Sequence, residues 1–202
     1  MIKHLAELSP NKRYRLITQC LVPRPVAWVL TGNADDSYNL APFSYFGGVA
    51  SDPPLLMLSI GKKPDGSDKD TRKNIAERGD FVVHIPTGPE AEIVTATSAS
   101  LDYGQSEVSA QALETETFGD FSLPRLKAAK IAFACSRYRL EEITPSQAMI
   151  LGEIKTIYVA DDIASETDGK VMVDTQKLNP LSRLGGNDYG LLGEIKDVPR
   201  PK

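Results

Sequence analysis

Histidine and cysteine are scarce in this sequence, with two residues of each among 202. Cys20 and Cys135 lie far apart and form no C-x-x-C pair, so the sequence supports neither a metal site nor a thioredoxin-like motif. Cys135 falls in an apolar run, where a free thiol packs as a small hydrophobic group, and we expect both cysteines to be structural. His84 falls in a run typical of a strand, so we interpret it as a hydrogen-bonded strand residue rather than a catalytic base.

The chain also lacks a basic excess and a long apolar segment. Its formal net charge is −4, which gives no electrostatic reason to expect nucleic-acid binding. No apolar run reaches about 18 residues, the length of a membrane span, and residues 1–11 lack the apolar core of a signal peptide. We therefore expect a cytoplasmic protein without a membrane segment. The length of 202 residues fits a single domain over residues 1–202, and the ordinary hydrophobic fraction of 41% predicts a packed core.

Strands separated by short turns dominate the pattern, and helices are bunched in the middle of the chain. The predicted strands cover residues 25–31, 38–45, 55–60, 81–85, 129–143, 147–159 and 171–173. The predicted helices cover residues 72–78, a segment that begins at Pro89, and residues 107–113. Residues 55–60 are almost entirely apolar, which indicates a strand buried on both faces. This order favours a mainly β (α+β) fold, an antiparallel barrel with a few peripheral helices, over a Rossmann sheet.

Residues 39–48 are polar at the start, then aromatic, then rich in glycine. Small residues such as these glycines would let a flat ligand approach the backbone. Pro42 has no backbone N–H group, so the amides of Ala41, Phe43 and Ser44 are the donors that we expect to be available. The alternative is an edge strand that is broken by the proline and ends in a flexible turn. Composition alone favours this alternative.

The segment Lys69-Asp70-Thr71 precedes a predicted helix that ends at Gly79. Free amides and the positive end of the helix dipole attract phosphate, and Lys69 and Thr71 would add a charge and a hydroxyl donor. Either Asp70 or Thr71 can cap the helix. For Asp70 this role is the better interpretation, because a phosphate would repel its carboxylate. Without further context, an ordinary capped surface helix is the favoured interpretation of these residues.

Arg24 stands between Pro23 and Pro25. The two rings restrict the backbone, which would hold the guanidinium ready for an anion or for the edge of an aromatic ring. A solvated arginine in a stiff loop is an equally good interpretation.

Taken in order, these segments resemble the flavin-reductase-like family. The segments that carry the resemblance are 24–29, 39–44, 52–54, 69–71, 74–75, 152–154 and 180–186, with Tyr189. The resemblance covers nearly the whole chain. It implies an FMN-binding split β-barrel that forms a homodimer, with the flavin near the subunit interface.

The resemblance also implies roles for single residues. The isoalloxazine and ribityl chain would contact Asn39, Leu40, Ala41, Pro42, Phe43 and Ser44. The phosphate would contact Ser59, Lys69 and Thr71, while Asp70 would order the turn. Arg24 would approach the flavin or its phosphate, and Arg183 and Tyr189 would close the site. His84 departs from the family pattern, in which a small polar residue is usual.

The activity implied is an NAD(P)H-dependent flavin reductase, in which a nicotinamide passes hydride to N5 of the flavin, with a monooxygenase as a possible partner. The alternative is an electron carrier that keeps FMN and docks with a redox partner. A barrel that has lost flavin and a pyridoxamine-phosphate-oxidase-like role have less support. Because the flavin supplies the chemistry, we predict no catalytic residue and no metal ligand.

Overall fold

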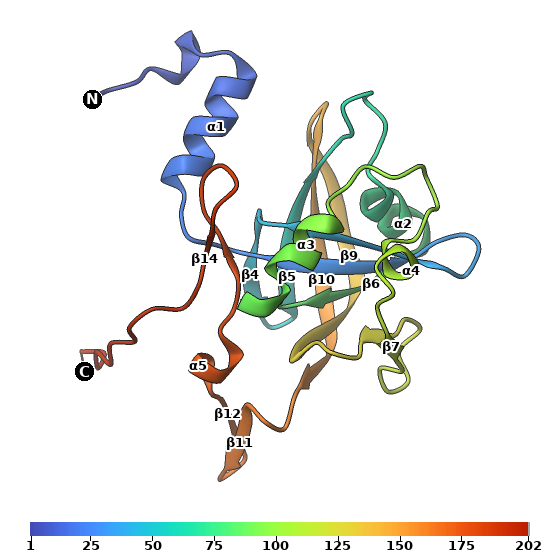
Figure 1. The fold of residues 1–202 in the computed structure, drawn as a ribbon, viewed down its shortest axis with the longest axis vertical. Helices are drawn as coiled ribbons and strands as arrows, with labels where there is room; N and C mark the ends of the chain where they lie inside the picture. Colours follow the sequence, from blue (N-terminus) through green and yellow to red (C-terminus); the bar gives the residue numbers. More distant parts are fainter. Residues whose placement is uncertain (202) are drawn as a thin grey trace.

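The computed structural model describes residues 1–201, and its centre is a seven-stranded antiparallel sheet that curls into a barrel (Figure 1). In sheet order the strands are β3 (Tyr38–Phe43), β2 (Ala27–Gly32), β6 (Asp80–His84), β9 (Ile131–Thr144), β10 (Gln147–Val159), β5 (Pro54–Gly61) and β4 (Phe46–Ser51). β3 and β4 stand at the two ends of this order, so the barrel is split between them. The mainly β, antiparallel split-barrel fold is therefore confirmed.

Short helices and small sheets surround the barrel. The helices are η1 (Leu5–Glu7), α1 (Pro10–Cys20), α2 (Asp70–Arg78), η2 (Gly88–Glu90), α3 (Ala91–Ala96), α4 (Glu107–Ala110) and α5 (Thr175–Leu178). The small sheets join β1 (Arg24–Pro25) with β13 (Ser182–Arg183) and β14 (Tyr189–Gly190), β7 (Thr115–Glu116) with β8 (Arg125–Leu126), and β11 (Ala164–Thr167) with β12 (Lys170–Val173).

Alternation along β2 supplies two hydrophobic cores. Ala27 and Val29 pack inside the barrel, in a cluster that also contains Phe81. Trp28 and Leu30 point the other way, into a cluster with residues of α3 and α4. β2 is thus buried on both faces, and its position fixes the neighbouring edge strand β3.

α2 closes one end of the barrel. Ile75 of this helix belongs to the interior cluster, and Gly79 ends the helix with a positive φ of 87°, as predicted. The long β9–β10 hairpin bears a close approach at Gly152, where a Cβ atom would collide with the Phe81 ring. A glycine is therefore needed at this buried point of the barrel wall.

α1 stands away from the barrel and is flanked by the C-terminal segment (Figure 1). Thr18 is its one buried residue, while Tyr14 and Leu21 beside it are 61% and 57% exposed. Within residues 1–201, no helix is both long and apolar enough to cross a membrane.

Several expected elements need correction. α1, β4 and β11 were not predicted, and α4 ends at Ala110 rather than at residue 113. β4 contains Gly47 and Gly48, so its strand form comes from backbone pairing with β5 rather than from strand propensity. β5 is not buried throughout, because Met57 and Ser59 are partly exposed between buried neighbours. α2 begins at Asp70, and neither Asp70 nor Thr71 is its N-cap residue, which is Lys69.

Candidate functional site

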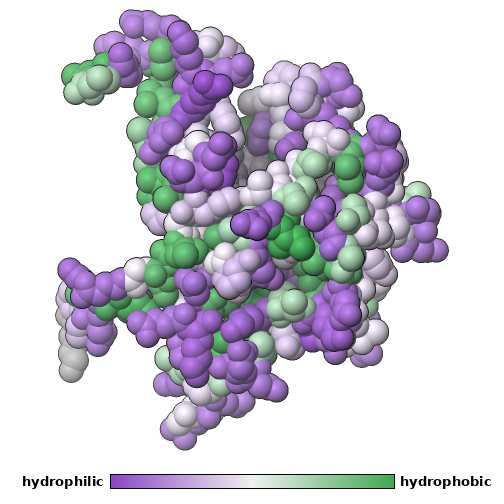
Figure 2. Space-filling model, in the orientation of Figure 1, coloured by the Kyte–Doolittle hydropathy of each residue, from purple (hydrophilic) through white to green (hydrophobic). Residues whose placement is uncertain are grey.

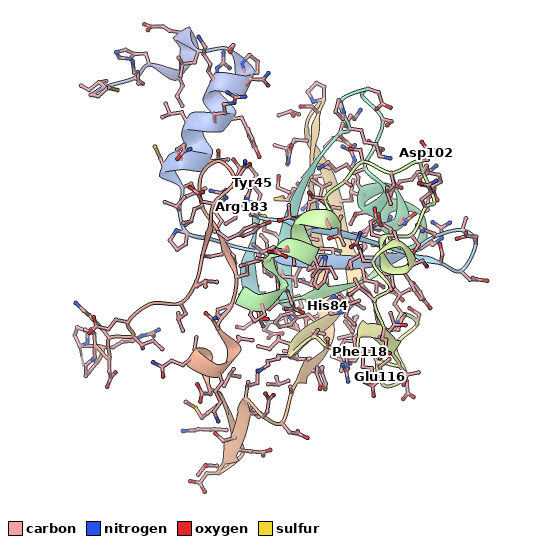
Figure 3. The ribbon with its side chains drawn as sticks, viewed as in Figure 1. Tyr45, His84, Asp102, Glu116, Phe118 and Arg183 are labelled. Atoms are coloured by element: carbon pink, nitrogen blue, oxygen red, sulfur yellow. The ribbon has the colours of Figure 1, made fainter. Side chains whose placement is uncertain are left out.

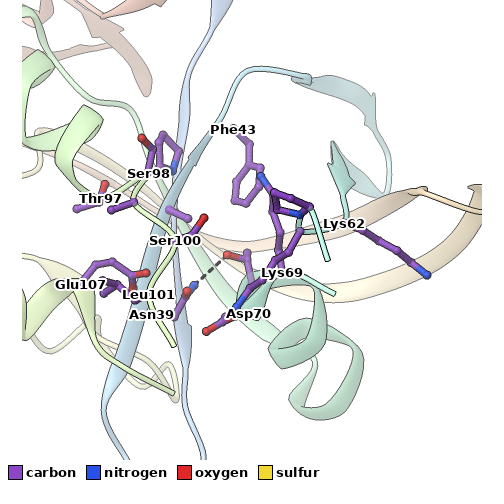
Figure 4. A pocket seen from close by; sticks show the side chains of 16 residues that line it. Asn39, Phe43, Lys62, Lys69, Asp70, Thr97, Ser98, Ser100, Leu101 and Glu107 are labelled. Carbon is purple, nitrogen blue, oxygen red and sulfur yellow. Dashed lines mark hydrogen bonds and ion pairs between the residues drawn. The ribbon is translucent and has the colours of Figure 1, made fainter. Parts of the chain in front are cut away.

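A cavity of about 320 Å³ lies between β3 and the start of α2 (Figure 4). Lys62, Lys63 and Lys69 stand on one side of it. The opposite side consists of residues 97–101 and Glu107. The cavity therefore has a basic wall, which carries three lysines and Asp70, and a second wall of mostly small residues with Glu107.

A second cavity, of about 290 Å³, adjoins the first and shares Pro42, Phe43, Lys62 and Lys69 with it. Ser59 lines this second cavity, where its hydroxyl accepts a 2.8 Å hydrogen bond from the Gln147 amide. Of the three residues expected at a phosphate, Thr71 thus lines the first cavity, Ser59 the second and Lys69 both.

The basic wall carries an unneutralised charge at Lys69. Lys63 pairs with Asp70 at 2.6 Å, and Asp70 also accepts a bond of 3.4 Å from the Gly104 N–H group. Among residues 1–201, Lys69 has no carboxylate partner, and its ammonium lies 5.6 Å from the centre of the Phe43 ring. Although Lys69 remains exposed, loss of water around its ammonium and, second, the charge of Lys63 lower its pKa. An anion beside Lys69 would oppose both effects, because an opposite charge favours the protonated ammonium.

Asn39 and Thr71 belong to a buried polar network behind the cavity. The Asn39 amide donates to the Thr71 hydroxyl at 2.9 Å and to the Thr31 hydroxyl at 3.1 Å. Asn74 donates to Thr31 at 3.1 Å, so the network fastens α2 to β2 and β3. Because Thr71 accepts through its oxygen, its own hydrogen is still available for a ligand.

The edge of β3 is covered in part by Glu107, a residue that the sequence did not single out. Its carboxylate accepts the Leu40 N–H group at 2.9 Å, and burial raises the pKa of this carboxyl. Since N–H groups alternate in direction along a strand, those of Ala41 and Phe43 point towards β2. The expectation that these two amides face a ligand is therefore wrong, whereas the Ser44 amide lies beyond the end of β3 and is not directed by this pairing.

Arg24 is fixed by the protein itself. Its Nη1 atom donates to the carbonyls of Thr18 and Leu21, at 2.8 and 2.5 Å, and its Nη2 atom donates to the Leu184 carbonyl at 3.0 Å. Its Nε atom lies 3.3 Å from the Ser44 hydroxyl. At most one of its five N–H groups remains free, so this geometry favours an anchoring role over direct contact with a flavin.

His84 has the structural role that its position in a strand suggested (Figure 3). The ring is fully buried, with Nδ1 3.0 Å from the Trp28 carbonyl and Nε2 accepting the Leu126 N–H group at 2.9 Å. Burial lowers the pKa of His84 from 6.5 to about 4. Cys135 is buried, and burial raises the pKa of its thiol, whereas Cys20 is exposed. Among residues 1–201, no group of three or more His, Cys, Asp or Glu side chains is arranged to hold a metal ion.

A family model described as Flavin reductase like domain matches residues 19–180. The chain belongs to the flavin reductase-like family. A crystal structure of nitrilotriacetate monooxygenase component B from Bacillus cereus is similar, with a TM-score of 0.89 and 32% identity over 98% of each chain. A crystal structure of 2-nitrobenzoate 2-nitroreductase from Pseudomonas fluorescens gives a TM-score of 0.90 and 28% identity, and covers 100% of this chain and 96% of that one. An uncharacterized protein of Halalkalibacterium halodurans is 36% identical over 96% of this chain and 93% of its own.

Family membership agrees with oxidoreductase activity and with the barrel described above. Within that barrel, the residues expected to contact a flavin ring end at Ser44, beside the second cavity. Arg183 and Tyr189, which were expected to close the site, line neither of the two cavities at Lys69. The Arg183 guanidinium instead stacks 4.7 Å from the centre of the Tyr189 ring, on the side of the barrel near α1.

Proposed function

We propose that the two joined cavities bind FMN and that the protein is an NAD(P)H-dependent flavin reductase. The observation that carries the proposal is the charge of Lys69, which has no acidic partner among residues 1–201 and stands at the start of α2, where both cavities meet. When bound, FMN would supply the redox chemistry, as acceptor of a hydride from a reduced nicotinamide and as donor of two electrons and a proton to a final acceptor.

The residues present fit the two ends of FMN. Lys69, the Thr71 hydroxyl and the free N–H groups of the first turn of α2 would hold the phosphate. The segment from Pro42 to Ser44 and the Phe43 ring would lie against the flat isoalloxazine. The chain's task is then to bind and orient the ring, and no side chain has to exchange a proton in this proposal.

Two further parts of the proposal concern partners. Because a similar structure is named as a monooxygenase component, we propose that reduced flavin is passed to an oxygenase. We also propose a homodimer in which a second copy covers Ile17 and Leu21, since these apolar side chains at the end of α1 and just after it are exposed. Light scattering of the wild type and of a chain lacking residues 1–20 tests this, with a dimer expected only for the wild type.

Flavin titration of a charge variant tests the cofactor. Lys69→Gln is expected to weaken FMN binding by about 1 to 3 kcal/mol, or roughly five- to 150-fold in Kd, because one charge-assisted hydrogen bond is lost. Lys73→Gln is the matched control, since Lys73 lies on the same helix but over the Tyr103 ring at 3.7 Å. Equal affinities of the two variants would remove Lys69 from the phosphate site.

A visible spectrum recorded during anaerobic addition of NADH or NADPH tests the activity. Flavin bands that bleach rapidly with either nucleotide support the reductase. Bands that persist favour an electron carrier with another reductant, and a protein that takes up no FMN would contradict the cofactor itself.

A further inference from the structure

A separate cavity of about 440 Å³ lies between α1 and the segment 183–187, on the side of the barrel where α1 stands off and a hollow is visible (Figure 2). Its lining includes Arg15, Arg24 and Arg183. No carboxylate contributes to the lining among the residues described. The cavity is therefore strongly basic, although the chain as a whole has a net charge of −4.

None of these three guanidinium groups is neutralised within residues 1–201. Arginines elsewhere do pair with carboxylates, namely Arg72, Arg78, Arg125 and Arg139. Arg24 is the sharpest case, because it is only 5% exposed and all of its acceptors are neutral oxygens. A buried charge without a counter-charge is unfavourable, and an anion in the cavity would stabilise it.

The other two arginines are placed to contact such an anion. Arg15 is exposed at the cavity and makes no side-chain hydrogen bond within residues 1–201. Arg183 donates to the Gly186 carbonyl at 2.6 Å and stacks on Tyr189, which orients its guanidinium while leaving further N–H groups free. Planar guanidinium groups of this kind bind phosphate through pairs of hydrogen bonds.

The basic cavity adjoins the second cavity of the proposed flavin site. Tyr14 and Ser44 line both. Tyr14 is 61% exposed and offers a flat ring on which a nucleobase could stack. A ligand that extends from the flavin ring towards Arg183 would thus place its phosphate groups at the arginines and a planar base near the Tyr14 ring.

We propose that this cavity binds the phosphate groups in the adenylate half of a nicotinamide dinucleotide. The proposal deepens the reductase function and rests on it for the identity of the ligand, whereas the basic site itself stands on the arginines. Arg15 and Arg183 contact the phosphates, and the buried Arg24 supplies a fixed positive charge beneath them.

Calorimetric titration of the full chain with ADP, with and without saturating FMN, tests the site. We expect ADP to bind in both cases, and Arg15→Gln and Arg183→Gln to weaken it by roughly ten-fold or more each, as the loss of a charge-assisted bond implies. Arg13→Gln is the control, because Arg13 lies on the same helix but bonds to the Leu8 carbonyl outside the cavity. It is expected to bind ADP as the wild type does.

Three outcomes overturn the proposal. The wild type does not bind ADP, or Arg13→Gln weakens ADP binding as much as the other two variants do. In the third outcome FMN and ADP compete, and Arg15→Gln and Arg183→Gln both lose FMN binding. The last outcome would assign the cavity to the flavin. Failure of the reductase function is recognised separately, since ADP would then still bind through Arg15 and Arg183 while neither NADH nor NADPH bleached the flavin.

Discussion

His84 allows a prediction of stability that comes directly from geometry. The ring is fully buried and uses both nitrogens, one towards the Trp28 carbonyl and the other as acceptor of the Leu126 N–H group. Protonation would place a charge in the core and remove that acceptor, so the pKa falls to about 4 in the folded protein from 6.5. A group with a lowered folded-state pKa stabilises the protein above its unfolded pKa, and this stability is lost as the pH falls. Between pH 7 and pH 5 the loss is about 2 kcal/mol.

Urea unfolding of the wild type and of His84→Gln over this pH range measures the loss. The glutamine amide can donate and accept but cannot become charged, so the free energy of unfolding of the variant should fall by about 2 kcal/mol less than that of the wild type. In a His4→Gln background, His84 is the one histidine left, and its ring protons can be followed by NMR during an acid titration. A measured pKa near 6.5, or parallel pH profiles of the two proteins, would refute the reasoning.

Two further substitutions test the packing around the site. Glu107→Leu should lower the free energy of unfolding by about 1 to 3 kcal/mol, because the Leu40 N–H group loses its acceptor. Glu107→Gln keeps an acceptor oxygen and should be nearly neutral, and urea titrations measure both variants. Gly152→Ala should destabilise the barrel by about 1 to 3 kcal/mol, since the new methyl group collides with the Phe81 ring, and a thermal-unfolding midpoint equal to that of the wild type would contradict this.

The sequence predicted those elements whose local pattern agrees with their final environment. The β9–β10 hairpin has strand-forming residues on both arms of a short polar turn, and its predicted ends lie within two residues of the observed ones. β4 and α1 were missed because their form depends on partners. β4 takes its hydrogen bonds from β5, and α1 buries Thr18 alone, so neither shows the apolar periodicity of an ordinary core element.

The same distinction applies to the candidate site. Lys69 and Thr71 could be singled out because they adjoin the start of a helix in the sequence, and the resemblance to the family then favoured a phosphate site over an ordinary helix cap. Glu107 could not, since an acid in the first turn of a helix is common, and its bond to Leu40 joins residues 67 positions apart. The anchoring of Arg24 is equally hidden, because one of its acceptors is the distant Leu184 carbonyl.

The unpaired edge of β3 explains why the proposed site lies where it does. The backbone groups of Tyr38, Leu40 and Pro42 face away from β2. The first two are covered at the start of α4, where Ser106 donates to the Tyr38 carbonyl at 2.6 Å and the Glu107 carboxylate accepts from the Leu40 N–H group. Pro42 has no N–H group to expose, so a strand added at this edge would lack one ladder donor at that point. What remains open is the Pro42 carbonyl and the backbone that follows it, beside Lys69. A ligand with a flat polar edge and a phosphate can therefore reach the sheet here, whereas an extended peptide would find the edge covered at Tyr38 and Leu40 and short of a donor at Pro42.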